Sequence, residues 1–290
     1  MAIRYSDGFP GDAHPESTGY HRAAMTDQLS LRLSAALPNP PTTLRPMLAR
    51  TVTEPFDSAD HLFEPSWGGL RVLAIIGPGD EPGSGDVVFH RLDGAVLSIV
   101  PIELSGLGVR VAARSAVLDG ELVVADTTGT ADPSELARRL AGQPGRPVAF
   151  LAFDLLHLDG VSLLNQPLER RRQLLRRTLR PGDEVLTVPA IPGEGRALFD
   201  AVVAQGLAGV LARHRSGPYL PGVRSRLWRF IPSTAEGLAR LPAPGDEVRS
   251  MDDVDRAASA PVLAVIRRLP LGLEDLDPGR SDPASPPDSA

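Results

Sequence analysis

The sequence has no cysteine and no lysine, because all 30 residues in its combined lysine and arginine count are arginines. Without cysteine, the chain cannot form disulfides, a thiolate nucleophile or a cysteine-ligated zinc site. Without lysine, it has no side-chain amine that can lose a proton and attack an electrophile. The arginine guanidinium, whose pKa lies above about 12, stays protonated and is a poor nucleophile. These absences exclude several classes of covalent catalysis.

Long hydrophobic runs are also missing. No apolar segment approaches the roughly 20 residues that cross a membrane, and residues 4–7 are polar where a signal peptide needs an apolar stretch. We therefore expect a cytoplasmic protein without membrane contact and without a bound metal. The 290 residues, 42% of them hydrophobic, are enough to bury a core. Nothing in the sequence indicates the oligomeric state.

The formal net charge of −6 argues against a strongly basic nucleic-acid-binding protein, but the charges are unevenly distributed. Residues 45–169 hold 9 arginines and 17 acidic residues, whereas residues 170–232 hold 12 arginines and 4 acidic residues. The arginine-rich part, residues 170–229, could contact DNA or DNA-repair proteins. Alternatively, the two parts attract each other within one folded domain.

Glycine and proline punctuation divides the chain into three regions. Residues 1–43 are predicted to be a flexible leader with one short amphipathic segment, and residues 233–290 a Pro/Ala/Asp-rich tail with one helix. Between them, β-rich runs predict strands over residues 70–76, 86–90, 116–125 and 148–156. Apolar spacing predicts helices over residues 133–141, 168–179 and 195–205. Without regular βαβ alternation, this order favours an α+β domain over residues 44–232, built on antiparallel sheets flanked by helices.

Residues 64–71 read Glu-Pro-Ser-Trp-Gly-Gly-Leu-Arg. Taken alone, this segment is most simply a turn that enters a strand. Other short motifs precede and follow it in a fixed order, namely residues 44–49, 89–94, 117–122, 152–156, 167–172, 206–213 and 224–230. Together they resemble the adenylation domain of bacterial ATP-dependent DNA ligases. The resemblance covers residues 44–232 and implies the covalent nucleotidyltransferase fold, with ATP or AMP as the ligand.

In that family, a lysine attacks the α-phosphorus of ATP, and Ser66 stands at the position of this lysine. The resemblance also implies that Ala208 replaces a glutamate that helps to hold the catalytic metal, which weakens any Mg²⁺ site. Phe230 and Pro232 replace two lysines that neutralise the α-phosphate. We therefore predict no catalytic residue, because losing one charge-stabilising group typically costs about 3–4 kcal/mol of transition-state stabilisation.

The residues that the resemblance assigns to nucleotide recognition remain. They are Glu64 beside the adenine, Arg71 and Arg91 at the ribose and phosphates, Glu121 at the ribose, Phe153 stacked on the base, and Arg213 in place of a lysine. A bland interpretation stands beside this one. Glu64 would be a solvated loop acid, Glu121 would follow a tight Asp-Gly turn, and Phe153 would be a core aromatic.

We therefore expect a ligase-like protein that cannot adenylate itself and that acts as a nucleotide-binding or regulatory pseudoenzyme in DNA repair. One alternative is a residual ligase that acts on pre-adenylated nicks, a step that needs no lysine adenylate. Another is an arginine-rich scaffold that binds nucleic acid or protein. Residues 233–290 are short for an OB-fold and poor in alternating strands, so the sequence predicts that this domain of complete ligases is absent.

Overall fold

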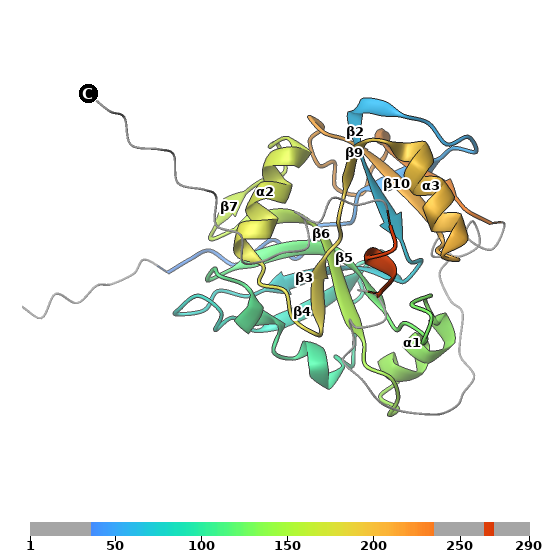
Figure 1. Ribbon diagram of the computed structural model, residues 1–290. Coiled ribbons are helices and arrows are strands. Elements are labelled where there is room, and N and C mark those ends of the chain that lie inside the picture. Colours follow the sequence, from blue (N-terminus) through green and yellow to red (C-terminus); the bar gives the residue numbers. More distant parts are fainter. Residues whose placement is uncertain (1–35, 235–263, 270–290) are drawn as a thin grey trace, which may run out of the picture. The chain divides into compact units, whose positions relative to one another are not determined.

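The computed structural model describes residues 36–234 and 264–269 of the chain (Figure 1). The folded domain belongs to the unit that begins at Ala36. Residues 1–35 of the predicted leader and most of the predicted tail lie outside the described residues. The absence of an OB-fold therefore stays a prediction. Residues 264–266 of the predicted tail are helical.

Two sheets form the framework of the domain. The five-stranded sheet has the order β1-β11-β10-β2-β9, and the six-stranded sheet has the order β4-β3-β5-β6-β7 with β8 beside β6. The strand pairs are antiparallel except for β1–β11 and β6–β8, which confirms the predicted antiparallel architecture. The strands span β1 Leu48–Thr51, β2 Ser58–Ser66, β3 Leu70–Ile76, β4 Val87–Arg91, β5 Ala116–Val123, β6 Ala149–Leu158, β7 Val161–Ser162, β8 Val185–Thr187, β9 Ile191–Gly193, β10 Gly209–His214 and β11 Arg224–Pro232.

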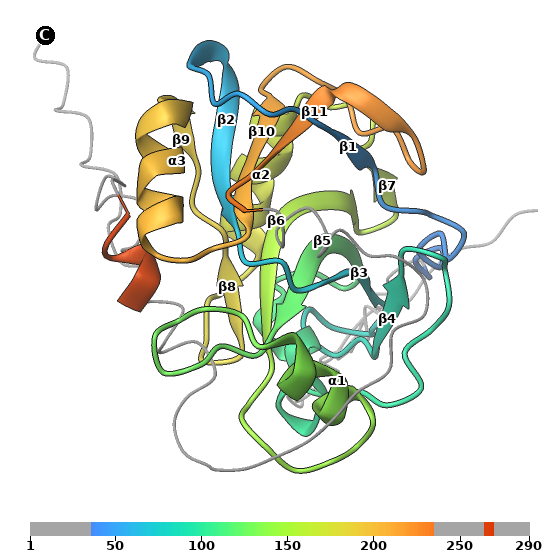
Figure 2. The ribbon, with the colours of Figure 1, turned by 90° about the vertical axis from the view of Figure 1, so that its right-hand side faces the viewer.

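The three predicted helices are confirmed as α1 (Pro133–Leu140), α2 (Leu168–Thr178) and α3 (Gly195–Ala204). The Asp132 side chain caps α1 by accepting a hydrogen bond from the Glu135 backbone N–H at 3.0 Å, and Pro133 occupies the first turn. α2 packs against β6, and α3 against β10 and β2 (Figures 1 and 2). Two short 3₁₀ helices, Ile102–Leu104 and Leu107–Arg110, were not predicted.

One apolar cluster joins the two sheets. Phe63 of β2 and Val210 of β10 belong to the same buried cluster as Leu151 and Phe153 of β6. Figure 2 shows β2, β10 and β11 on one side of this interior and β3, β5 and β6 on the other. Residues from the described C-terminal segment, 264–269, also belong to the cluster. Because both sheets contribute to one core, the side chains at their junction are held in fixed positions.

No helix in the described part of the chain is both long enough and apolar enough to cross a membrane.

Candidate functional site

The motifs identified in the sequence converge where the two sheets meet. Ser66 is the last residue of β2 and pairs with Gly209, the first residue of β10. Residues 67–69 then lead into β3 in the second sheet, as the sequence predicts for a turn entering a strand. The segment that the resemblance assigns to the nucleophile motif therefore forms one of the covalent links between the sheets.

This linking segment is shaped by a glycine and a buried carboxylate. Gly69 leaves no room for a side chain, because a Cβ atom there would lie 2.2 Å from the backbone oxygen of Leu122. Glu121 accepts hydrogen bonds from the backbone N–H groups of Trp67 and Gly69, both at 3.1 Å. Burial raises the pKa of Glu121, although these hydrogen bonds oppose the rise. Both Glu121 carboxylate oxygens thus hold the chain rather than facing open space.

Arg71 of β3 is committed to an acid inside the domain. Its Nε and Nη2 atoms each donate to Asp119 of β5 at 2.6 Å, in the bidentate geometry that favours strong ion pairs. Tyr219 donates a further hydrogen bond to Asp119 at 2.6 Å and accepts one from the Met47 backbone at 2.9 Å. Burial acts to lower the pKa of Arg71, but the attraction of Asp119 outweighs it and raises that pKa.

Glu64 of β2 is buried and contacts two arginines. It forms an ion pair with Arg172 of α2, and its Oε2 lies 2.5 Å from Nη2 of Arg213 on β10. Burial raises the pKa of Glu64, although both arginines act in the opposite direction. Burial also lowers the pKa of Arg213 to about 10, despite the nearby carboxylate. For both Glu64 and Arg213, burial therefore shifts the pKa toward the neutral form by more than the attraction of the opposite charges shifts it back.

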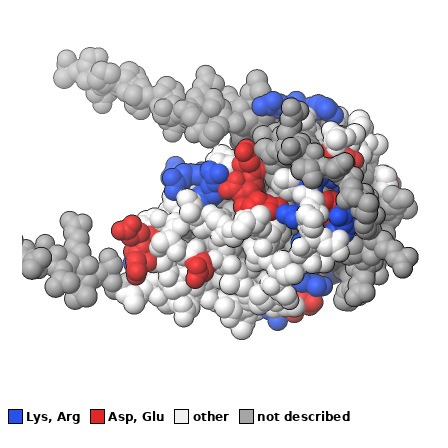
Figure 3. Space-filling view, turned by 90° about the horizontal axis from the view of Figure 1, so that it is seen from below, with Lys and Arg blue, Asp and Glu red and all other residues white. Residues whose placement is uncertain are grey.

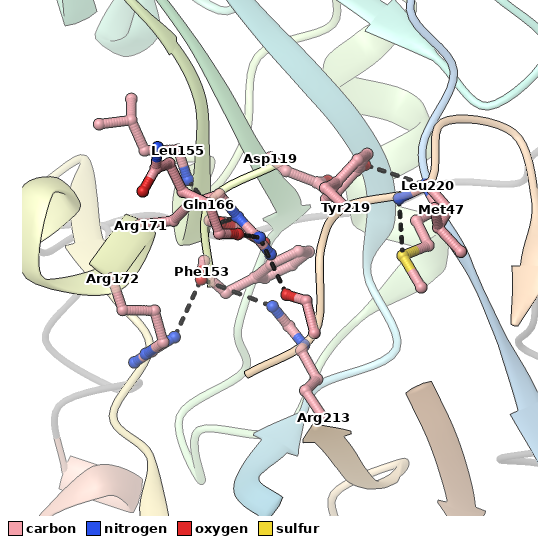
Figure 4. Close-up of polar contacts among 12 residues, drawn as sticks. Met47, Asp119, Phe153, Leu155, Gln166, Arg171, Arg172, Arg213, Tyr219 and Leu220 are labelled. Carbon is pink, nitrogen blue, oxygen red and sulfur yellow. Dashed lines mark hydrogen bonds and ion pairs between the residues drawn. The ribbon is translucent and has the colours of Figure 1, made fainter. Parts of the chain in front are cut away.

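The Phe153 ring lies between two guanidinium groups. The Cζ atom of Arg71 is 4.4 Å from the ring centroid and that of Arg213 is 4.0 Å from it, both within cation–π range. Trp228 of β11 adds a second aromatic ring, 4.6 Å from Cζ of Arg213. Arg172 and Arg213 also contact the Phe153 carbonyl oxygen, at 2.9 and 3.5 Å (Figure 4). The surroundings of Phe153 are thus filled by the chain's own cations.

The positions expected to carry chemistry offer no charged group. Ser66 is half-buried, and within residues 36–234 and 264–269 no side chain forms a hydrogen bond with its hydroxyl group. Ala208 and Phe230 are buried, and Pro232 is half-buried. In the described ranges, no group of three or more His, Asp or Glu side chains is arranged to hold a metal ion. A serine hydroxyl without a base is a weak nucleophile.

Arg91 does not join the other predicted recognition residues. Its guanidinium contacts Asp93 of its own hairpin at 3.6 Å, and its side chain remains 41% exposed. Within the arginine-rich part, Arg171, Arg172 and Arg213 are buried and paired with acids from elsewhere in the fold. On the face in Figure 3, basic and acidic side chains lie side by side on a mostly uncharged surface.

Two parts of the bland interpretation are wrong. Glu64 is 1% exposed within a strand, so it is not a solvated loop acid. Asp119 and Gly120 lie inside β5 rather than in a turn. A glycine is needed at residue 120 because a Cβ atom there would clash with the Phe150 ring and the Leu151 carbonyl oxygen of β6. Phe153 is indeed a core aromatic, 5% exposed.

Sequence reasoning missed the partners that hold the recognition residues. Asp119, Asp154, Arg171 and Arg172 all stand inside the ligase-like motifs, but the sequence assigned no role to them. Arg171 and Asp154 form a buried bidentate pair, with both hydrogen bonds at 2.8 Å. The sequence did contain a signal for this pair, because one motif holds an acid within an apolar strand and another holds arginines. Since buried charges are generally paired, an ion pair between the two motifs could have been predicted.

The two joined sheets, the order of the motifs and the position of Ser66 define the covalent nucleotidyltransferase class of the DNA ligase type. A family model described as "ATP dependent DNA ligase domain" matches residues 106–229. Over these residues the chain is similar to the adenylation domain of ATP-dependent DNA ligases, and among the proteins it resembles are the LigD ligases of mycobacteria.

The similarity to LigD appears in sequence and in structure. The multifunctional non-homologous end joining DNA repair protein LigD of Mycobacterium tuberculosis is 34% identical over 186 residues, which are 64% of this chain and 23% of LigD. A mycobacterial DNA ligase D complexed with ATP and MES superimposes with a TM-score of 0.56 and 29% identity over 66% of this chain and 60% of that one. A probable DNA ligase of Sorangium cellulosum is 32% identical over 64% of this chain and 36% of that protein. The chain thus spans about a quarter of LigD.

Proposed function

We propose that this chain is an adenylation-domain homologue that does not form a covalent adenylate and that acts as a nucleotide-binding or regulatory partner in DNA repair in the cytoplasm. One observation carries the proposal, namely that no lysine exists anywhere in the 290 residues. By the resemblance, Ser66 stands at the position of the nucleophilic lysine. The similarity to LigD, a non-homologous end joining DNA repair protein, supports the link to DNA repair.

The residues fit ATP poorly at its phosphate end. Ala208, Phe230 and Pro232 cannot bind a metal ion or neutralise a phosphate, so we derive no step through Mg²⁺. At the base end, Phe153 and Glu64 are retained, but Arg213 contacts both. ATP or AMP is the ligand that we propose because a solved mycobacterial relative was complexed with ATP. In this chain the nucleotide would be bound, not consumed.

Contacts with DNA or repair proteins are proposed for the exposed arginines of residues 170–229. Arg170 and Arg177 on α2 and Arg226 on β11 are exposed and have no ion pair with any residue in the described ranges. Exposed, unpaired guanidinium groups are the side chains that bind phosphate groups most readily. The buried arginines of the same part cannot contribute to such a surface.

A joining assay on two nicked DNA substrates tests this proposal. Neither an ordinary 5′-phosphate nick with ATP nor a pre-adenylated nick should be sealed, with rates at least roughly 10³-fold below those of an active ATP-dependent ligase. The ordinary nick requires self-adenylation, whereas the pre-adenylated nick requires only the last chemical step. Sealing of the pre-adenylated nick at a rate near that of the active ligase would instead identify a residual ligase.

A further inference from the structure

Arg213 is held less well than the other buried arginines around Phe153. Arg71 donates two hydrogen bonds to Asp119, and Arg171 donates two to Asp154. Arg213 approaches Glu64 at 2.5 Å, but Glu64 Oε2 accepts no well-aligned hydrogen bond within the described residues. The Nε atom of Arg213 is also buried without a partner among those residues; Nε of Arg172 likewise has none, but Arg172 makes three hydrogen bonds through its Nη atoms. A buried donor without a partner costs about 1–3 kcal/mol.

Glu64 does not depend on Arg213 for its charge balance. Arg172 already forms an ion pair with Glu64. It also donates hydrogen bonds to the Phe153 carbonyl oxygen at 2.9 Å and to the Val188 carbonyl oxygen at 2.6 Å. If Arg213 left its position, Glu64 would keep one buried cationic partner. The Phe153 and Trp228 rings would each lose the nearer of their two guanidinium neighbours, while Arg71 would remain 4.4 and 5.4 Å from the two ring centroids.

The rings and the carboxylate together favour a flat, electron-poor group that carries N–H donors. A guanidinium meets this description because it stacks on an aromatic face and donates to a carboxylate. An amino-substituted purine base meets it too, through ring stacking on Phe153 and an exocyclic amino group. The two groups would use the same ring face and the same carboxylate, so they cannot be present together.

We propose that Arg213 is an internal occupant of the base-binding position and that an adenine nucleotide enters only when Arg213 leaves. This inference rests on the proposed function, since it concerns the same site. It assigns to Arg213 the regulation of nucleotide binding rather than contact with a bound nucleotide. The measured dissociation constant for AMP is then the intrinsic constant divided by the fraction of molecules in which Arg213 is displaced.

The test is calorimetric titration of AMP into the full chain and into Arg213→Ala. AMP should bind Arg213→Ala at least roughly tenfold more tightly than the unchanged chain, because the cost of displacing Arg213 is removed. Phe153→Ala added to Arg213→Ala should abolish the gain. Arg196→Ala, which removes an exposed arginine paired with Asp57 at 3.5 Å, is the matched control and should bind AMP like the unchanged chain.

A second measurement covers the case in which Arg213→Ala is poorly folded. Millimolar methylguanidinium should raise the melting temperature of Arg213→Ala, leave that of Arg196→Ala unchanged and compete with AMP for Arg213→Ala. Equal AMP affinity in folded Arg213→Ala and the unchanged chain would overturn the inference, as would AMP binding that methylguanidinium does not weaken. Failure of the proposed function would appear separately, as covalent adenylation or nick sealing, neither of which these binding experiments detect.

Discussion

Replacement of Arg171 with methionine is expected to lower the free energy of unfolding by about 3–5 kcal/mol, because it leaves the Asp154 carboxylate buried without its cation. Both side chains of this pair are fully buried, and Arg171 donates to both oxygens of Asp154 at 2.8 Å. Arg171 also donates to the carbonyl oxygens of Gln166 and Gly217, at 2.6 and 3.2 Å. Its loss at the junction of α2, β6 and the β10–β11 loop therefore also removes the Arg171 donor from the Gln166 carbonyl, whereas the Gly217 carbonyl still accepts from the Leu168 backbone N–H at 3.1 Å.

Urea denaturation of three variants measures this effect. Arg196→Met makes the same substitution in a helix at an exposed ion pair and should cost less than about 1 kcal/mol. The double variant Arg171→Met with Asp154→Leu should recover most of the loss, because apolar residues can replace a buried pair. If Arg171→Met unfolds at the same urea concentration as Arg196→Met, the buried pair does not hold this junction.

The second large effect is expected for Gly69→Ala, which should destabilise the domain by about 3 kcal/mol. A Cβ atom at residue 69 would lie 2.2 Å from the Leu122 backbone oxygen and 2.6 Å from a methyl group of Val123. A backbone oxygen in a paired strand cannot move away without separating β3 from β5. The linking segment would then shift, and Glu121 would lose its hydrogen bond from the residue 69 N–H.

Gly106→Ala is the matched control for this substitution, because a Cβ atom there would have no neighbour within 4 Å and the φ of Gly106 is −93°. Replacement there should be neutral or stabilise by up to about 1 kcal/mol, since alanine restricts the unfolded chain. Thermal unfolding of both variants gives the comparison. Equal melting temperatures would show that the sheet junction accommodates the extra methyl group.

The contrast between Gly69 and Ser66 explains which parts of the ligase motifs persist. Gly69, Glu121, Arg71 and Glu64 each hold the domain together in this structure, through close packing, backbone hydrogen bonds or buried ion pairs. Ser66 stands where the related ligases need a nucleophile, and no packing requirement at that position demands a lysine. If Ser66 does stand in place of the lysine, these structural roles account for the retention of the surrounding motif residues.

Much of the fold was predictable because local patterns decide it. The strand over residues 70–76 and the helices beginning at Pro133, Leu168 and Gly195 were predicted from β-rich runs, apolar spacing and turn residues. The 3₁₀ helices, which follow Pro101 and Gly106, carry no comparable periodic signal.

The positions of the arginine side chains around Phe153 could not be predicted, because they depend on contacts between residues far apart in the chain. The resemblance placed Arg213 at the site, but its position over Phe153 follows from the packing of β10 against β6 and β11. Likewise, pairing of Arg172 with Glu64 joins residues 108 positions apart. The roles predicted for Arg91 and for the other recognition residues toward a nucleotide remain predictions.

The central claim is that this ligase homologue cannot adenylate itself. Incubation of the full chain with ATP labelled at the α-phosphate and with Mg²⁺, followed by denaturing electrophoresis, tests it most directly, with an active ATP-dependent ligase as the positive control. The account predicts label on the control and none on this chain, with or without the Ser66→Ala substitution. Label that remains on this chain after denaturation and is lost in Ser66→Ala would show that the serine forms an adenylate and would contradict the account.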